Sequence, residues 1–312
     1  MLISLCNIFI FPGILFLIAM SFIAEFYDRK LYAVFQNRVG PPWYQPVADF
    51  IKLISKEEII PEEADPAVFE LMPIFSITAV ITAFFYIPVW STKALFSFSG
   101  DIIVVLYLLT IPTLTLFLGG WYSRSVYATI GAMRSLIQLF AYEIPLLASI
   151  LASALLANTW SLSEMAVFYS RHPWLWLANI IGFVISALTL MGKLEKGPFD
   201  IPEAETEIVA GTLTEYSGKL LGFFRLAMNM EMIVGSSLLA AVFLPFGLKN
   251  GPVAGFALYI LKIFLVVSMI SLFRTVFARL RIDQMIRLCW KYIAPFAFLQ
   301  IIISLIIKGM IK

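Results

Sequence analysis

Carboxylates gather in one short stretch of this sequence, Glu195 to Gly211, which reads EKGPFDIPEAETEIVAG. The chain is 61% hydrophobic, yet this stretch holds five acidic side chains: Glu195, Asp200, Glu203, Glu205 and Glu207. Neighbouring like charges raise one another's pKa, so carboxylates at this spacing suit the uptake and release of protons beside a membrane. The alternative is that the acids only complement a helix dipole and stay solvated.

The same stretch predicts the start of a short helix. The dipeptide Gly197–Pro198 favours a turn, and Asp200 has a typical N-cap side chain with a glutamate three residues later. On a helix that begins there, Glu203 and Glu207 share a face, and Glu205 lies on another.

A further carboxylate, Glu143, lies deep in an apolar run that reads GAMRSLIQLFAYEIPLL. An ionisable group in hydrocarbon is costly unless it faces a bundle interior or a water-filled cavity. Arg134 precedes it by nine residues, about 13 Å along a helix axis, which is too far for a direct pair. We interpret Glu143 as a group that gains and loses a proton; the alternative is a permanently paired carboxylate that holds two helices together. Arg225 and Glu231 are similarly placed in a later run, where the structural interpretation is preferred.

The sequence offers no ligand set for a metal cluster or a haem. Cys6 and Cys289 stand far apart without a C-x-x-C motif, and His172 is the only histidine. Iron–sulfur clusters need several thiolates, and haem needs an axial ligand. We therefore expect no cofactor on this chain and expect any electrons to travel on a partner protein.

Composition predicts an all-α polytopic membrane protein, with residues 1–312 forming a single membrane domain. Only 13% of the residues are charged, and the mean hydropathy is +0.92. The apolar runs approach the roughly 20 residues that cross a bilayer as a helix, and they lack the alternation of a β-barrel. We expect about eight spans, at approximately 2–26, 68–90, 101–118, 130–157, 174–192, 218–246, 253–276 and 290–308.

Basic residues are distributed unevenly between the loops, about four to one in favour of the odd-numbered loops. The even-numbered loops carry only Lys93, Arg171 and Lys249. By the positive-inside rule, the odd loops, including 27–67 and 193–217, face the cytoplasm, and both termini lie outside the plasma membrane. The net charge of +2 and the lack of a basic patch give no indication of nucleic-acid binding.

The first cytoplasmic loop contains a pattern typical of a short amphipathic helix that begins near Pro46. Four apolar residues follow helical spacing, namely Val47, Phe50, Ile51 and Ile54. Such a helix lies at the membrane surface or under a docked partner, or else it packs on the protein's own spans.

The motif EKGPFDIPEAETEIVAGTLTEYSG resembles the signature of subunit 1 of respiratory complex I and of its relatives, the membrane subunits of energy-converting NiFe hydrogenases. The similarity extends to the segments QNRVGPPWYQPVADFIKLISKE, GAMRSLIQLFAYEIPL and ARLRIDQMIRLCWKYIAP, so that it covers nearly the whole chain. The eight helices and external termini of that family agree with the predicted topology.

The resemblance implies a subunit of a multisubunit oxidoreductase that joins a peripheral redox arm to ion-pumping membrane subunits. Partner subunits would carry the NiFe centre and the iron–sulfur clusters; the expected partners are hydrogenase-like large and small subunits and antiporter-like membrane subunits. A path for protons or sodium ions would use Glu143, Asp200, Glu203, Glu205, Glu207 and Glu215. Docking of the peripheral arm, or charge pairing, would use Arg38, Arg134, Arg274, Arg279, Arg281 and Arg287.

Two departures from the quinone-using relatives favour the hydrogenase-type branch, in which ferredoxin supplies the electrons. This chain runs directly from RVGPP through WY to Gln45–Pro46, without the extra residues of those relatives, and it has Met228–Asn229 where they tend to have Glu-Tyr. The predicted function is thus the anchoring and coupling subunit of a ferredoxin-linked, ion-pumping complex, a membrane-bound hydrogenase or a related sulfur reductase. The alternative is the quinone-binding subunit of complex I. An autonomous ion transporter is less favoured, because the sequence shows no internal repeat.

Overall fold

A computed structural model describes residues 2–89, 93–244, 246 and 251–311. These residues form helices joined by loops and turns, with no β-strand among them. Eight helical segments are long and apolar enough to cross a membrane: Leu5–Phe35, Pro66–Phe85, Asp101–Tyr122, Val126–Ala157, Pro173–Lys193, Gly218–Phe243, Val253–Val276 and Ile282–Met310. The predicted class, an all-α polytopic membrane protein with eight spans, is confirmed.

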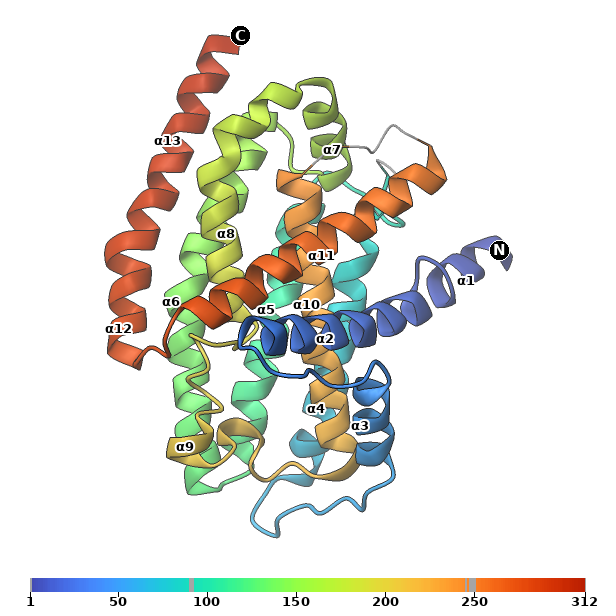
Figure 1. The fold of residues 1–312 in the computed structure, drawn as a ribbon, viewed down its shortest axis with the longest axis vertical. Coiled ribbons are helices and arrows are strands. Elements are labelled where there is room, and N and C mark those ends of the chain that lie inside the picture. Colours follow the sequence, from blue (N-terminus) through green and yellow to red (C-terminus); the bar gives the residue numbers. More distant parts are fainter. Residues whose placement is uncertain (1, 90–92, 245, 247–250, 312) are drawn as a thin grey trace.

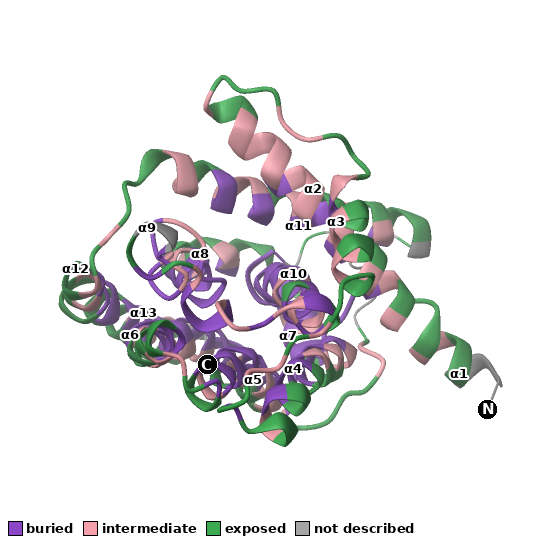
Figure 2. Ribbon diagram, turned by 90° about the horizontal axis from the view of Figure 1, so that it is seen from below, coloured by how far each residue is buried: buried purple, intermediate pink, exposed green. Residues whose placement is uncertain are grey.

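One helix, α10 (Gly218–Phe243), forms the centre of the bundle. It packs against α2 (Ile14–Phe35), α4 (Pro66–Phe85) and α11 (Pro252–Val276), and 89% of its most apolar stretch is buried inside the protein. In Figure 2 the buried residues lie along the inner helices and the exposed ones along the rim. The centre of the protein is therefore shielded from lipid by the surrounding helices.

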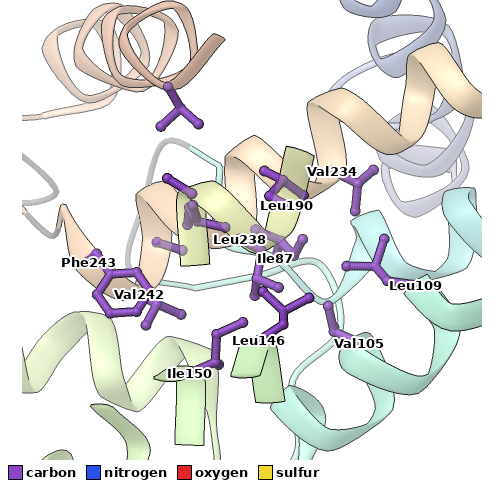
Figure 3. Packing of buried hydrophobic residues seen from close by; sticks show 14 of the residues in the cluster. Ile87, Val105, Leu109, Leu146, Ile150, Leu190, Val234, Leu238, Val242 and Phe243 are labelled. Atoms are coloured by element: carbon purple, nitrogen blue, oxygen red, sulfur yellow. The ribbon is translucent and has the colours of Figure 1, made fainter. Parts of the chain in front are cut away.

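The other main helices are arranged around α10 in two orientations. Figure 1 shows α6 (Val126–Ala157), α8 (Ile180–Lys193) and α13 (Ala294–Ile311) standing roughly parallel, whereas α2 and α11 run obliquely across them. The fifth helix, α5 (Asp101–Tyr122), packs between α4 and α6. Figure 3 shows apolar side chains of one buried cluster, among them Leu146 and Ile150 of α6 and Leu238 and Val242 of α10.

The first span is longer than predicted and begins after a break. A short helix, α1 (Leu2–Phe9), ends before Gly13, and α2 then continues to Phe35 rather than ending at 26. The predicted loop 27–67 is accordingly wrong at its start, because the charged residues after Phe26 belong to the helix. Asp28 is buried there and paired with cations from other segments, which removes the cost that charge normally imposes on such a helix.

Several other boundaries differ from the predicted ones. The second span ends at Phe85 and the sixth at Phe243, whereas the third continues to Tyr122. A 3-10 segment (Pro173–Asn179) leads into α8. Two short helices were not predicted: α7 (Leu162–Arg171), and α12 (Ile282–Arg287), which continues through a π-helical turn (Leu288–Ile293) into α13.

The predicted amphipathic helix is present as α3 (Gln45–Ile54), which lies against α2 and α10. Phe50 packs toward Phe22 of α2, and the other three residues of the predicted apolar face, Val47, Ile51 and Ile54, are exposed. The helix therefore packs on the spans through one edge and presents the rest of its apolar face outward.

Candidate functional site: buried charges at the end of an acidic loop

Three ionisable side chains from three helices meet inside the bundle. The Lys193 ammonium, at the end of α8, lies 3.7 Å from Glu143 Oε2 of α6 and 4.0 Å from Glu231 Oε1 of α10. The side chains of Lys193, Glu143 and Glu231 are 1%, 14% and 4% exposed. We call these three residues the triad. Glu143 thus lies among charged partners, in contrast to the prediction that considered only its own helix.

The triad is held by ion pairs rather than by hydrogen bonds. Glu143 Oε2, Lys193 Nζ and Glu231 Oε1 are all buried and have no hydrogen-bond partner among the described residues. A buried polar atom without a partner is costly, and such atoms concentrate where proteins move protons or charge. The Lys193 ammonium also lies 5.5 Å from the centre of the Tyr142 ring, a further contact that stabilises a cation.

Glu195 lies two residues beyond the triad lysine, in a left-handed backbone conformation with φ +50°. A side chain in that conformation costs roughly 1–2 kcal/mol compared with the usual region. The residue is only 6% exposed, and neither of its carboxylate oxygens has a hydrogen-bond partner in the described part of the chain. Burial and the nearby carboxylates of Glu203, Glu231 and Asp200 raise the pKa of Glu195 well above its ordinary value.

A second buried cluster surrounds Asp28 of α2. The Lys196 ammonium lies 2.5 Å from Asp28 Oδ2, Ser271 of α11 donates a hydrogen bond to Asp28 Oδ1, and the Arg274 guanidinium lies 3.6 Å away. Arg274 also stacks over the Tyr32 ring at 4.2 Å. Arg274 is therefore an internal ion-pair partner here, and its predicted role in docking stays a prediction.

A third charged group lines a cavity of about 280 Å³ between α2, α3 and α10. Arg29 pairs with Glu25 and with Asp49, the latter at 2.9 Å, and Asn229 of α10 donates a hydrogen bond to Glu25. Phe22, Phe50, Leu53, Leu221 and Leu226 complete the wall with apolar surface. Lys52, Lys56 and Arg225 also line it, so the cavity combines apolar surface with several charged groups.

The acidic loop, residues 194–217 between α8 and α10, folds differently from the predicted helix. Residues 201–203 form a turn, and the four-residue helix α9 (Glu205–Ile208) starts only at Glu205, whose side chain lies outside the described residues. Phe199 and Ile201 are buried, and Gln138 of α6 donates a hydrogen bond to the Phe199 carbonyl. This burial overrides the local capping signal, so the expected helix start at Asp200 is wrong.

Each acid of the loop has its own surroundings. Glu207 forms a 2.7 Å salt bridge with Arg134, which lowers the pKa of its carboxyl, whereas Glu203 lies 3.9 Å from Arg225. The predicted shared face of these two acids is therefore not formed. The Asp200 carbonyl accepts a hydrogen bond from Arg279, and Glu215 is half-buried near the start of α10.

The remaining predicted basic residues lie at the surface. Arg279 and Arg281 are exposed and line a hollow of about 380 Å³ together with Arg134, Glu207 and Asp283. Arg38 and Arg287 are exposed elsewhere. Within the described ranges, no group of three His, Cys, Asp or Glu side chains is placed to hold a metal ion.

Sequence reasoning missed Lys193, Lys196 and Asp28 as parts of this site. Lys193 follows an apolar run directly, a position where a lysine usually marks the cytoplasmic end of a span. Its partner Glu231 is on a different helix and was given only a structural interpretation. The signal in the sequence that could have identified these residues is that several ionisable side chains follow the ends of apolar runs.

Comparison with known proteins identifies the family. A family model described as NADH dehydrogenase matches residues 7–305. The chain belongs to this family. It is 32% identical to the H subunit of NADH-quinone oxidoreductase from Carboxydothermus hydrogenoformans, over 95% of this chain and 85% of that protein. It is 35% identical to the corresponding H subunit from Bacillus mycoides, over 98% of this chain and 96% of that protein.

A similar fold is found in a solved respiratory complex. A chain in the structure of the membrane-bound sulfane sulfur reductase, an archaeal respiratory membrane complex, matches with a TM-score of 0.85 and 26% identity. The match covers 97% of this chain and 98% of that one. The chain is therefore a complex I-like membrane subunit of an oxidoreductase complex, in agreement with the resemblance noted in the sequence.

Proposed function

We propose that this chain anchors and couples a ferredoxin-linked, ion-pumping respiratory complex, a membrane-bound hydrogenase or a related sulfur reductase. Its acidic loop and the triad connect the peripheral redox arm to proton or sodium translocation in the membrane. NiFe centres or other metal centres and iron–sulfur clusters reside on partner subunits, and antiporter-like subunits lie beside it in the plasma membrane.

The observation that carries this proposal is the buried triad of Glu143, Lys193 and Glu231. Buried ionisable groups inside a membrane domain mark routes for ions or protons. The acidic loop directly follows Lys193 in the chain, so it supplies a charged, hydratable approach from the side on which α3 and α9 lie. Redox chemistry on a partner can bias such a path by changing charge at its entrance.

The choice of the hydrogenase-type branch has two supports. The direct connection from RVGPP to Gln45–Pro46 and the presence of Met228–Asn229 in α10 distinguish this sequence from the quinone-using relatives. The fold also matches a chain of a sulfane sulfur reductase complex over almost its full length. Both observations favour a complex in which no quinone is needed.

The alternative function is a quinone-binding subunit, and one observation favours it. The cavity between α2, α3 and α10 is lined by apolar residues together with charged ones, Glu25, Arg29 and Asp49 among them. Small-molecule sites commonly combine such a wall with a few polar groups. The names of the curated relatives agree with this alternative.

Purification of the intact complex through a tag on this chain tests the proposal. We expect a large subunit with metal-binding cysteines and a ferredoxin-reducible cluster subunit to copurify, and ferredoxin oxidation to proceed without added quinone. Copurification of an NADH-oxidising module, together with an absolute requirement for quinone, would establish the alternative instead.

A further inference from the structure

The position of Glu195 is unusual for a glutamate. It follows Lys193 and the helix-ending residue Leu194, and its left-handed conformation closes α8 through hydrogen bonds from Glu195 N to the Gly192 carbonyl and from Lys196 N to the Met191 carbonyl. Glycine or asparagine normally occupies this place, because a side chain strains the backbone. Strain that persists at such a position points to a role for the side chain itself.

The environment of Glu195 favours a neutral carboxylic acid. The side chain is almost completely buried; its oxygens have no hydrogen-bond partner of ordinary geometry among the described residues, and the nearby Ser135 hydroxyl of α6 only partly offsets the effect of burial. The charged groups that raise its pKa are carboxylates from two sides, Glu203 and Asp200 from the loop and Glu231 from α10. An ionised Glu195 would therefore be both desolvated and repelled.

The neighbouring triad has the complementary property of accepting one proton. With Lys193 protonated and both carboxylates ionised, the triad carries one net negative charge. Uptake of one proton by Glu231 or Glu143 makes it neutral, which is the less costly state in a buried site. Glu231 is taken as the acceptor because its charge is among those that raise the pKa of Glu195.

We propose that Glu195 is a proton carrier, protonated in the resting protein, which delivers its proton to the Glu231 carboxylate of the triad and is reloaded from the acidic loop. In this step the Glu195 O–H bond breaks and an O–H bond to Glu231 forms, so that one negative charge moves from the triad to Glu195. Reprotonation of Glu195 from the loop, together with onward release of the proton from Glu231, restores the resting state. The direction in which protons move rests on the proposed function. The resting protonation of Glu195 does not, because it is a property of this chain alone.

Infrared spectroscopy of the purified complex tests the resting state directly, because a protonated carboxylic acid absorbs apart from a carboxylate. We expect Glu195→Gln to remove a protonated-carboxyl band. The matched control is Glu70→Gln, which changes an exposed acid on α4 outside the proposed path and should leave that band in place. An unchanged spectrum in Glu195→Gln overturns the proposal.

Glu195→Gly separates the role of the side chain from that of the backbone. Glycine adopts the left-handed conformation without strain, so the variant should assemble at least as well as the wild type. We expect electron transfer with an artificial donor to persist, and ions pumped per electron to fall about tenfold or more, since a positioned proton carrier commonly contributes on the order of 100-fold in rate. Pumping at the wild-type ratio in Glu195→Gly would show that Glu195 is only a helix cap.

The two experiments fail in different ways. If the wild-type complex moves no ions, the proposed function is wrong, yet the infrared band still reports whether Glu195 holds a proton. If the wild-type complex pumps and the band does not depend on Glu195, the proposed function stands and this carrier assignment is wrong.

Discussion

The ammonium of Lys193 lies within 4.0 Å of two carboxylates, Glu143 and Glu231, inside an apolar bundle. Without it, Glu143 and Glu231 would face one another in a medium that screens their repulsion poorly. The lysine therefore compensates part of the negative charge of the two glutamates. The three residues are best understood as one unit, in which a change at one alters the others.

Glu143→Gln tests the use of this unit. The amide keeps shape and hydrogen bonding, but the triad becomes neutral before any proton arrives, so an incoming proton has no charge to compensate. We expect the complex to assemble and to transfer electrons with an artificial donor while ion pumping drops sharply. The control is Glu70→Gln, an exposed carboxylate on α4. Normal pumping in Glu143→Gln would identify Glu143 as a structural anchor.

Lys193→Met tests the stabilising role of the cation. Removing one partner of a buried ion pair costs about 3–5 kcal/mol, because uncompensated charge remains. We expect a lower unfolding temperature of the purified complex and partial recovery in the double variant Lys193→Met, Glu231→Gln. A single variant as stable as the wild type would show that the carboxylates already bind protons and do not need the lysine.

Sequence reasoning found the residues that stand alone in apolar runs and missed those at the ends of runs. Glu143 was recognisable because nothing near it in the chain is charged, whereas Lys193 looked like an ordinary flanking lysine. Asp28 was assigned to a loop because ionisable residues follow closely after Phe26, whereas the structure places it in α2, paired with Lys196 and Arg274. Such pairs join residues far apart in the chain, so local patterns do not reveal them.

Among the helices, α6 depends on a close approach to the loop that follows α9. A Cβ added at Gly131 would lie 2.5 Å from Thr212 N and 2.7 Å from the Gly211 carbonyl carbon, both of them backbone atoms. The helix and the acidic loop are therefore fitted to each other at this point, and the loop cannot shift without losing the contact.

Gly131→Ala should consequently destabilise the protein by about 1–3 kcal/mol, the usual cost of overpacking. Loosening of the loop should appear as faster amide hydrogen exchange around Thr212. The matched control is Gly309→Ala on α13, where an added Cβ meets nothing within 4 Å. Equal effects of the two substitutions would contradict this account of the packing.

The number and type of helices followed from composition, whereas their ends and tilts did not. Apolar runs of about 20 residues specify spans, since the bilayer demands them. The local capping signal at Asp200 failed because Phe199 and Ile201 are buried against α6 instead. Tertiary burial decides such short segments, and a single sequence contains no direct record of it.

The orientation of the protein in the membrane remains a prediction from the distribution of basic residues. We expect a cysteine at position 249, which lies outside the described residues, to react with an impermeant reagent only from the external side. A cysteine at Arg38, which is exposed, should react only from the cytoplasmic side. Labelling of position 249 from the cytoplasm alone would show that the topology is the reverse of the predicted one.

Docking of a soluble redox module is expected on the surface that carries Arg279 and Arg281. Reversal of both charges, Arg279→Glu with Arg281→Glu, should release the module at moderate salt without unfolding the spans, because exposed charges contribute mainly to association. Recovery of the module after affinity purification measures the effect. The control is Lys308→Glu in the last turn of α13, whose C-terminal end lies away from α12 in Figure 1. Complete retention of the module in the double variant would show that the module docks on a different surface.

The central position of α10 also bears on how the protein is made. Of the eight candidate spans, it has the lowest hydropathy and the most buried surface. Transfer of such a segment from the translocation machinery into lipid is only weakly favourable. Its polar residues, Glu231 among them, should therefore slow its insertion. Its neighbours α2 and α4 are synthesised earlier and α11 later, so α10 reaches a favourable environment only by joining a partly built bundle. Biogenesis of this protein therefore depends on the order of helix release as well as on the hydrophobicity of each span.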